Sequence, residues 1–552
     1  MAPTIRTCSL ALAAALAGWP VAAEAKLPTV RSGASTFVAA KAAADAGDAR
    51  RSAILFASLA AAEPGNGMVA RRALAQAILA GDMPLALTLA RSRPAEELAP
   101  DARLLLLADE LKAGKARVDR LAPLPPEIGF LEPFVRAWLL AERGGEREAV
   151  RLLGSVGRDN LLFAAVVEHQ ALIWLDTGRV AEARPLIARA LAGAGGRGDR
   201  LRIAFAAALL RKGERNEALA LLGGRDPTLS RAAAVVGSSG RLEGEVRTAA
   251  SALSELLLGL ALTLGDSDSR ALPLSLVQVA RHADSANPQL RLVLALMLER
   301  SGRSDDAVAV LRAMPEGSPF VGDARDAEIR SLLADQRHEE ALARARAFLA
   351  AGREKAEDWV RLGDVLDAMG RHAEAAEAYG RAVAAVQNGG AGPEPWTLHL
   401  LRGAALEQGD SWPEAKSALE LARTLAPDNP IVLNYLGYAR LERGEQLDEA
   451  EALIARASKL APDDASITDS LGWAQFKRGR VDQAIDTLGR AAAADPLQAE
   501  IHEHLGDALY TAGRKFEARH AWAAALVTAG GEVRGRVEAK LAAGLDTANA
   551  AP

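Results

Sequence analysis

A small residue recurs at an almost constant spacing through the second half of the chain, and this period constrains the fold more than any other feature. Successive occurrences are 34, 34, 40, 35, 34 and 34 residues apart: Ala307, Ala341, Ala375, Ala415, Ala450, Ala484 and Ala518. A period of this length indicates a repeat in which each unit is one pair of helices that buries its apolar side only against its neighbours. We therefore expect a continuous stack of hairpins instead of the roughly three or four separate domains that a chain of this length usually forms.

Each unit carries further marks at fixed offsets from its alanine. The unit 465–498 shows Leu471-Gly472 in the first helix, Gly479 between the helices and Pro496 at the end of the second helix. A small residue at a helix crossing lets the two axes approach closely, and proline cannot donate the next helical hydrogen bond. The composition agrees, because 50% hydrophobic residues with only 4% aromatic residues favour helices rich in Ala and Leu over a sheet.

The last third of the chain resembles a known repeat. One unit opens with Trp359-Val360-Arg361-Leu362-Gly363, and prolines close three successive units: Pro427, Pro462 and Pro496. These residues resemble the tetratricopeptide repeat, a helix–turn–helix of 34 residues, most strongly over 356–531. The run Asp469-Ser470-Leu471-Gly472-Trp473 is similar to that of secreted bacterial tetratricopeptide proteins of envelope assembly. The resemblance implies an all-α fold, a right-handed α-solenoid, whose concave groove binds protein.

The period continues upstream, although the other marks become sparse there. Five small residues stay in register, each five residues after a glycine: Ser52, Ala86, Ala149, Ala183 and Ala218. Proline-rich and glycine-rich stretches interrupt the register at 97–130 and 224–248. We expect the following organisation: a signal peptide over 1–25, divergent repeats over 26–223, an irregular helical joint over 224–286, a superhelix over 287–531, and a capping helix with a frayed tail over 532–552.

The first 25 residues have the pattern of a secretory signal. Arg6 precedes an apolar run from about Cys8 to Val21, and Ala23-Glu24-Ala25 fits an A-x-A cleavage site. The run is shorter than the roughly 20 apolar residues of a membrane-spanning helix. We expect cleavage after Ala25 and an exported, periplasmic bacterial protein. Because Cys8 is the only cysteine, the mature chain would contain neither a thiol nor a disulfide.

The sequence shows no convincing catalytic or metal-binding motif. His502 and His504 are two residues apart on a helix, so they point in different directions and cannot share one ion, and a solvated helix face is expected there. Gly237-Ser238-Ser239-Gly240 is not the G-x-S-x-G elbow of a serine nucleophile. We expect a non-enzymatic protein without a metal or cofactor. An enzyme hidden near 224–272 is an alternative, which buried charged side chains clustered there would favour.

The remaining place for function is the concave face, which the first helices of this repeat line. Acidic and aromatic side chains occupy inward-facing positions in three consecutive units. The predicted peptide-binding groove consists of Asn434, Tyr438, Asp469, Trp473, Phe476, Lys477, Glu503, Asp507 and Tyr510. Aromatic side chains supply apolar contact area, and carboxylates favour a basic segment. Phe476 and Tyr510 also occupy places where this repeat packs an aromatic ring against its neighbour, so core packing is an alternative for these two.

The expected partner is therefore a protein or a peptide, and a basic segment fits best. A net charge of -5 gives no basic field for nucleic acid. A second hypothesis is a structural assembly factor for an outer-membrane, secretion or polysaccharide-export machine, which would use the convex and N-terminal surfaces.

Overall fold

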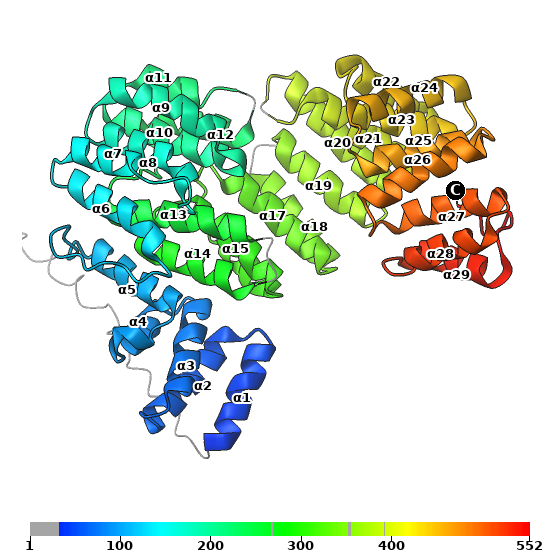
Figure 1. Ribbon diagram of the computed structural model, residues 1–552. Helices are drawn as coiled ribbons and strands as arrows, with labels where there is room; N and C mark the ends of the chain where they lie inside the picture. Colours follow the sequence, from blue (N-terminus) through cyan, green and yellow to red (C-terminus); the bar gives the residue numbers. More distant parts are fainter. Residues whose placement is uncertain (1–32, 225, 266–268, 352–354, 391, 552) are drawn as a thin grey trace, which may run out of the picture. The chain divides into compact units, whose positions relative to one another are not determined.

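The computed structural model describes residues 33–551 except 225, 266–268, 352–354 and 391, so the predicted signal peptide lies outside the described residues. The described part of the chain contains α-helices, four short 3-10 helices and no strand (Figure 1). The predicted all-α fold is confirmed. None of the described helices combines the length and the apolar character that crossing a bilayer requires.

The chain divides into two compact units, and the division falls within α12. The first unit contains residues up to Gly223 and residues 232–321, and the second contains residues 224–231 and 322–552. The helices of the first unit are α1 (Gly33–Asp45), α2 (Ala49–Ala62), α3 (Gly67–Ala80), α4 (Met83–Arg91), α5 (Pro100–Lys112), α6 (Glu132–Ala141), α7 (Glu146–Gly154), α8 (Val166–Asp176), α9 (Val180–Ala192), α10 (Gly198–Arg211), α11 (Arg215–Leu221), most of α12 (Pro227–Ser239), α13 (Ala249–Leu264), α14 (Ala271–Ala283), α15 (Gln289–Arg300) and α16 (Ser304–Arg312). Its 3-10 helices are Ala95–Glu97, Gly129–Leu131, Phe163–Ala165 and Gly195–Arg197.

The second unit continues the chain as successive helix pairs. Its helices are α17 (Val321–Ala334), α18 (His338–Ala351), α19 (Ala356–Ala368), α20 (His372–Gln387), α21 (Pro395–Gln408), α22 (Trp412–Leu425), α23 (Pro430–Glu442), α24 (Leu447–Leu460), α25 (Ala465–Lys477), α26 (Val481–Ala494), α27 (Ala499–Thr511), α28 (Lys515–Ala525) and α29 (Gly531–Ala543). From α19 to α28 each odd-numbered helix packs against the next, and successive first helices such as α23, α25 and α27 also contact one another.

The small residue of the period is fully buried in every unit where it was identified. Its exposed fraction is 0% at Ser52, Ala86, Ala149, Ala183, Ala218, Ala307, Ala341, Ala375, Ala415, Ala450, Ala484 and Ala518. In the first helices from α19 to α27 a glycine has a complementary role, since a Cβ atom added at Gly472 would lie 2.6 Å from Cγ of Leu488 on α26. The small residue therefore recurs with this period because it lies where the two helices of each hairpin pack closely together.

Most hairpins turn through a residue with left-handed backbone. Gly479 has a φ angle of 77°, which glycine adopts at little cost. In two hairpins the corresponding residue is not glycine, and Gln336 and Asp410 take φ angles of 60° and 57°. Side chains with a Cβ atom pay a steric penalty in this conformation. The turn geometry is thus retained even where the sequence does not favour it.

The first unit departs from a simple linear stack. Helix α14 packs against α5, which lies far from it in the sequence. Nζ of Lys112 donates to the carbonyl oxygen of His282 at 2.8 Å, and the Ser275 hydroxyl donates to Asp101 at 3.1 Å. The expected irregular joint over 224–286 contains three helices, α12 to α14. Backbone without a helix between α12 and α13 is confined to 240–248.

Candidate protein-binding groove

The nine predicted groove residues lie on α23, α25 and α27, the first helices of three consecutive hairpins. Polar caps fix where two of these helices begin: the Asp464 carboxylate accepts from the main-chain N–H of Ile467 at 3.0 Å, and the Asn429 side chain caps α23 in the same way. Asn434, Tyr438, Phe476 and Tyr510 are partly buried, and Lys477 is exposed. The other four residues are buried: Asp469, Trp473, Glu503 and Asp507.

Trp473 is covered by its own chain, and this corrects the expectation that its ring is open to a partner. Its exposed fraction is 1%. The indole ring stacks on Phe476 at a centroid distance of 4.9 Å and on the imidazole of His504 at 4.2 Å. Nζ of Lys477 lies 5.3 Å from the centre of the Trp473 ring. The aromatic residues of α25 thus pack as a stack between neighbouring helices.

His504 was expected on a solvated helix face, but it is buried against Asp469. Nδ1 of His504 lies 2.9 Å from a carboxylate oxygen of Asp469. Burial by itself would lower the pKa of His504. The charge and hydrogen bond of Asp469, with Asp507 and Glu503 nearby, outweigh burial and raise this pKa above its usual value. The pair fastens α27 to α25 and leaves Asp469 unable to serve a basic ligand from outside.

Glu503 and Asp507 are the clearest correction to the predicted open acidic groove. Their exposed fractions are 0% and 1%. Nζ of Lys540 lies 2.6 Å from Glu503 and 2.8 Å from Asp507, and Arg536 pairs with Glu503 at 2.7 Å. Both cations belong to α29, which packs beside α27 and α28 (Figure 1). The capping helix therefore supplies, within the same chain, the basic partner that these acids were expected to find elsewhere.

Residues 544–551 pack against the rest of the chain, although a frayed tail was expected there. Asn549 is buried, and its side-chain Nδ2 donates to the carbonyl oxygen of Gly544 at 2.9 Å. The main-chain N–H of Ala551 donates to Oδ2 of Asp507 at 3.1 Å. The tail therefore folds back onto α27.

Sequence reasoning missed the basic residues that neutralise the groove. Arg536 and Lys540 are four residues apart on α29, as Glu503 and Asp507 are on α27, so each pair occupies one face of its helix. This matching of two cations with two acids is a signal that the sequence contains. The tail contact between Ala551 and Asp507 has no comparable signal, because one of its two partners is a main-chain N–H.

The concave side also includes acidic residues of the preceding hairpins, and most of these carboxylates are paired. Oε2 of Glu357 lies 2.8 Å from Nη1 of Arg231, Oε1 of Glu407 lies 2.7 Å from Nη2 of Arg443, and Asp367 contacts His372. Asp364 on α19 differs, since its carboxylate accepts from the Tyr379 hydroxyl at 2.8 Å and has no cation partner among the described residues.

The pKa of Asp364 is raised to about 6. The main cause is the loss of hydration around the carboxylate, although the residue itself is exposed. The hydrogen bond from Tyr379 and the charge of Arg361 lower the pKa, whereas the charges of Asp326 and Asp367 raise it further. An incoming cation would relieve this repulsion.

Helix α23 has two acceptors without donors. Oδ1 of Asn434 and Oε1 of Glu442 are buried, and neither has a hydrogen-bond partner among the described residues. Tyr438 lies between them in sequence at a spacing of four residues, so the three side chains follow one stripe of the helix. Nζ of Lys477 reaches Glu442 only at 4.0 Å. Buried acceptors of this kind usually find donors, and a bound polypeptide can provide them.

Among the described residues of the stretch 224–272, one charged side chain is buried, and clustered buried charges are what would favour a hidden enzyme. Glu255 on α13 accepts from Arg200 at 2.9 Å, from Arg197 at 3.0 Å and from Asn287 at 2.8 Å. Burial by itself would raise the pKa of Glu255, but the two guanidinium groups outweigh it and lower the pKa. An ionised carboxylate occupied by these donors serves to hold α10 and α13 together and is poorly placed to take a proton.

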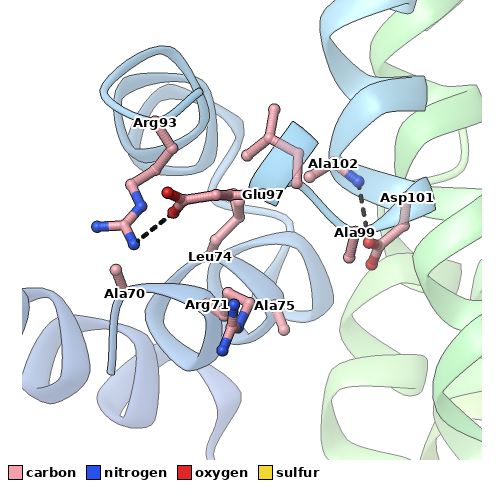
Figure 2. A pocket seen from close by; sticks show the side chains of 10 residues that line it. Ala70, Arg71, Leu74, Ala75, Arg93, Glu97, Ala99, Asp101 and Ala102 are labelled. Atoms are coloured by element: carbon pink, nitrogen blue, oxygen red, sulfur yellow. Dashed lines mark hydrogen bonds and ion pairs between the residues drawn. The ribbon is translucent and has the colours of Figure 1, made fainter. Parts of the chain in front are cut away.

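The first unit contains a cleft of about 1180 Å³ beside α10, α12 and the segment 240–247, and one of about 600 Å³ beside α5 and the segment 115–125. No group of three or more His, Cys, Asp or Glu side chains in the described part of the chain could hold a metal ion. A small cleft in the first unit is lined by residues of α3, α5 and the segment before α5, including Leu74, Glu97 and Asp101 (Figure 2). Its free volume is about 20 Å³, which is enough for a single water molecule.

Comparison with known proteins identifies the repeat. The family model described as Tetratricopeptide repeat matches residues 327–393, 403–465 and 470–532. A comparison with curated protein sequences finds no significant match.

The chain is also similar to chains of solved structures, at low identity. The crystal structure of the APC/C hetero-tetramer Cut9-Hcn1 shares 16% identity at a TM-score of 0.38, over 94% of this chain and 97% of that chain. YrrB, described as a TPR protein with an unusual peptide-binding site, shares 16% identity at a TM-score of 0.27, over 35% of this chain and 97% of that chain. MamA from Desulfovibrio magneticus RS-1 shares 18% identity at a TM-score of 0.27, over 31% of this chain and 94% of that chain.

At these values the assignment depends on the family match and on the helix pairs themselves. The matched segments coincide with hairpins whose small residues and turns follow the period. The chain contains tetratricopeptide repeats, which are matched between residues 327 and 532, and this repeat is a scaffold for protein–protein interaction.

Proposed function

We propose that this protein is a non-enzymatic adaptor of the bacterial envelope, which binds a segment of another protein on the concave side of α19 and α23. The supporting observations are the carboxylate of Asp364, which accepts from Tyr379 but has no ion-pair partner among the described residues, and the oxygens of Asn434 and Glu442, which have no hydrogen-bond donor there. A lysine or arginine side chain and main-chain N–H groups would satisfy them. Partly buried Tyr438 would supply apolar contact.

A selection experiment tests this proposal directly. We expect a random peptide library, selected on the purified full chain, to enrich peptides that contain Lys or Arg. The double variant Asp364→Asn with Glu442→Gln should lose this enrichment, since it removes two charges without changing the side-chain shapes. Glu377→Gln is the matched control, because Glu377 is an exposed carboxylate on the second helix α20. Enrichment that is absent, or that survives the double variant, would contradict the proposal.

Export is supported by the signal-like pattern of residues 1–25. Expression of the full chain in a bacterium should give a periplasmic protein whose first residue is Lys26. An uncleaved chain in the cytoplasmic fraction would count against an envelope role, but it would leave the peptide-binding proposal intact.

A second candidate is a structural assembly factor that uses the convex surface. Three leucines on the second helices α22 and α24 favour it because they are exposed: Leu421, Leu425 and Leu460. Crosslinking in the intact cell separates the two candidates. Loss of partners in a triple Leu→Gln variant, with no loss in the Asp364→Asn and Glu442→Gln variant, would favour the assembly factor.

A further inference from the structure

The chain after α29 follows a defined path onto the predicted groove. Helix α29 ends at Ala543, and Gly544 turns the backbone with a φ angle of 91°. A Cβ atom at Gly544 would collide with the hydroxyl of Tyr510, so the backbone passes directly beside this groove residue. Leu545 then packs against the hydrophobic cluster that contains Trp522 and Ala508.

Local hydrogen bonds shape the next residues into a turn. Oδ1 of Asp546 accepts from the main-chain N–H groups of Ala548 and Asn549, at 2.8 and 3.0 Å. Oδ1 of Asn549 accepts in return from the N–H of Asp546 at 2.8 Å, and its amide nitrogen donates to Gly544. These reciprocal bonds define the conformation of the tail independently of the groove.

The turn delivers Ala551 to the centre of the predicted groove. Its N–H donates to Asp507 at 3.1 Å, and its side chain joins the hydrophobic cluster of Trp473, Leu441 and Ala474, against which Tyr438 also packs. The exposed fraction of Ala551 is 5%, whereas the neighbouring Ala550 is exposed. Three residues predicted for a foreign peptide therefore surround or bind the end of this chain.

The tail and α29 differ in how firmly they are held. Lys540 on α29 is fully buried in two ion pairs, which would be costly to break. Between Leu545 and Ala551, by contrast, the only polar contact with α27 that the described residues show is one hydrogen bond, the apolar contacts are those of Leu545 and Ala551, and the side chains of Thr547, Ala548 and Ala550 are exposed. Alanine gains and loses almost no side-chain entropy when it is ordered or released. The tail can therefore leave while α29 stays in place.

We propose that residues 544–551 are a built-in ligand of the groove over α25 and α27, and that a partner segment binds there by displacing them. The partner would be an extended segment with small side chains, which donates one main-chain N–H to Asp507 and places a small apolar group beside Trp473. The displacement step rests on the proposed function, while the occupation of the groove by the tail does not. A tethered segment competes at an effective concentration on the order of millimolar. The tail therefore lowers the apparent affinity of the groove for a partner segment.

Thiol labelling tests whether the tail occupies the groove. Cys8→Ser removes the only cysteine, and Ala551→Cys or Ala550→Cys then places one thiol on the tail of the full chain. We expect a maleimide to label the thiol at position 551 at least roughly tenfold more slowly than the thiol at position 550. Equal rates would overturn the proposal. Hydrogen exchange over 545–551 in the unsubstituted chain gives an independent measurement, and exchange as fast as that of a free peptide would overturn the proposal as well.

A peptide of residues 544–551 tests whether the groove recognises this chemistry. A chain that lacks residues 545–552 should bind the labelled peptide saturably, and the full chain should bind it at least about tenfold more weakly. Placing Glu in the peptide at the position of Ala551 should abolish binding, whereas Glu at the position of Ala550 should not. No saturable binding by the shortened chain, or equal binding by both chains, would overturn the proposal.

The same two chains separate this inference from the proposed function. If the library enriches the same peptides with equal affinity on the full and the shortened chain, displacement is overturned and the adaptor function stands. If the shortened chain binds the tail peptide but selects nothing from the library, the tail is a ligand of the groove and the adaptor function fails.

Discussion

Lys540 and Glu503 form an ion pair at 2.6 Å in which neither side chain is exposed to solvent. The pair joins the capping helix to the first helix of the last matched hairpin. Most capping helices of solenoids offer water a polar outer face. Here the cap also neutralises Glu503 and Asp507, two residues of the predicted groove.

The first prediction concerns this pair. Lys540→Ala leaves Glu503 and Asp507 buried without their shared cation, and we expect it to reduce the free energy of unfolding of the C-terminal hairpins by about 3–5 kcal/mol. Hydrogen exchange in α27 and α29 measures this locally. Arg514→Ala is the control, because Arg514 forms a far more exposed pair with Glu517 and should cost much less stability. Equal effects of the two variants would refute the role of the buried pair.

The second prediction concerns the pH dependence from His504. Its pKa is raised in the folded chain, so its contribution to stability is complete below the unfolded pKa of about 6.5 and is lost as the pH rises through the folded value. The unsubstituted chain should therefore lose stability relative to His504→Gln as the pH rises from about 6 into the alkaline range. Urea unfolding at several pH values measures the free energy of unfolding of both chains. If the two free energies change with pH in parallel, the protonation of His504 does not contribute to stability.

The third prediction concerns the left-handed turns. Gln336 is exposed and has a φ angle of 60°, so Gln336→Gly should stabilise the hairpin of α17 and α18 by about 1 kcal/mol, because it removes a steric penalty. Gly479→Ala should destabilise its own hairpin by a similar amount. Thermal unfolding measures both changes. If Gln336→Gly lowers the melting temperature, the Gln336 side chain stabilises the turn by more than the left-handed backbone conformation costs.

The fourth prediction concerns the buried network of the first unit. Glu255→Gln keeps the shape of the side chain but leaves Arg200, which is fully buried, without its counter-charge. We expect a loss of about 3–5 kcal/mol in the stability of this unit. Glu243→Gln, at an exposed position nearby, should change it by less than about 0.5 kcal/mol. A Glu255→Gln chain that unfolds like the unsubstituted one would instead favour a functional role for this carboxylate.

The fold could be predicted because its signal is local and periodic. Each of the alanines from Ala307 to Ala518 reports a contact within its own hairpin, so the spacing alone locates the helix pairs. The packing of α14 on α5 could not be predicted in this way, because it joins segments far apart in sequence. The exposure of Trp473 was misjudged for the same reason, since its face is covered by His504 and by the tail.

The predicted groove lies on α23, α25 and α27, but most of its acidic side chains are not accessible to a partner. The periodicity of α25 and α27 places Asp469, Glu503 and Asp507 on inner faces, yet their charge is neutralised by His504 and by residues of α29. Whether an acidic side chain on the inner face stays unpaired depends on the basic side chains of the helix that packs next to it. Asp364 has no ion-pair partner among the described residues, although the charge of Arg361 on the same helix lowers its pKa in part.

The fifth prediction concerns Asp364, which, unlike the acids of α25 and α27, has no ion-pair partner in the described part of the chain. The folded pKa of Asp364 is raised to about 6 from a usual value of 3.8, so its charged form is disfavoured in the folded chain. The cost to stability is complete above pH 6 and disappears as the pH falls towards about 4. Asp364→Asn keeps an acceptor for Tyr379 and should raise the melting temperature at pH 7.5, with a gain that narrows between pH 6 and 4. Glu377→Gln should show no such trend. If Asp364→Asn lowers the melting temperature at pH 7.5, the carboxylate already has a compensating partner, and the acceptor-rich face proposed to bind a basic segment loses its main support.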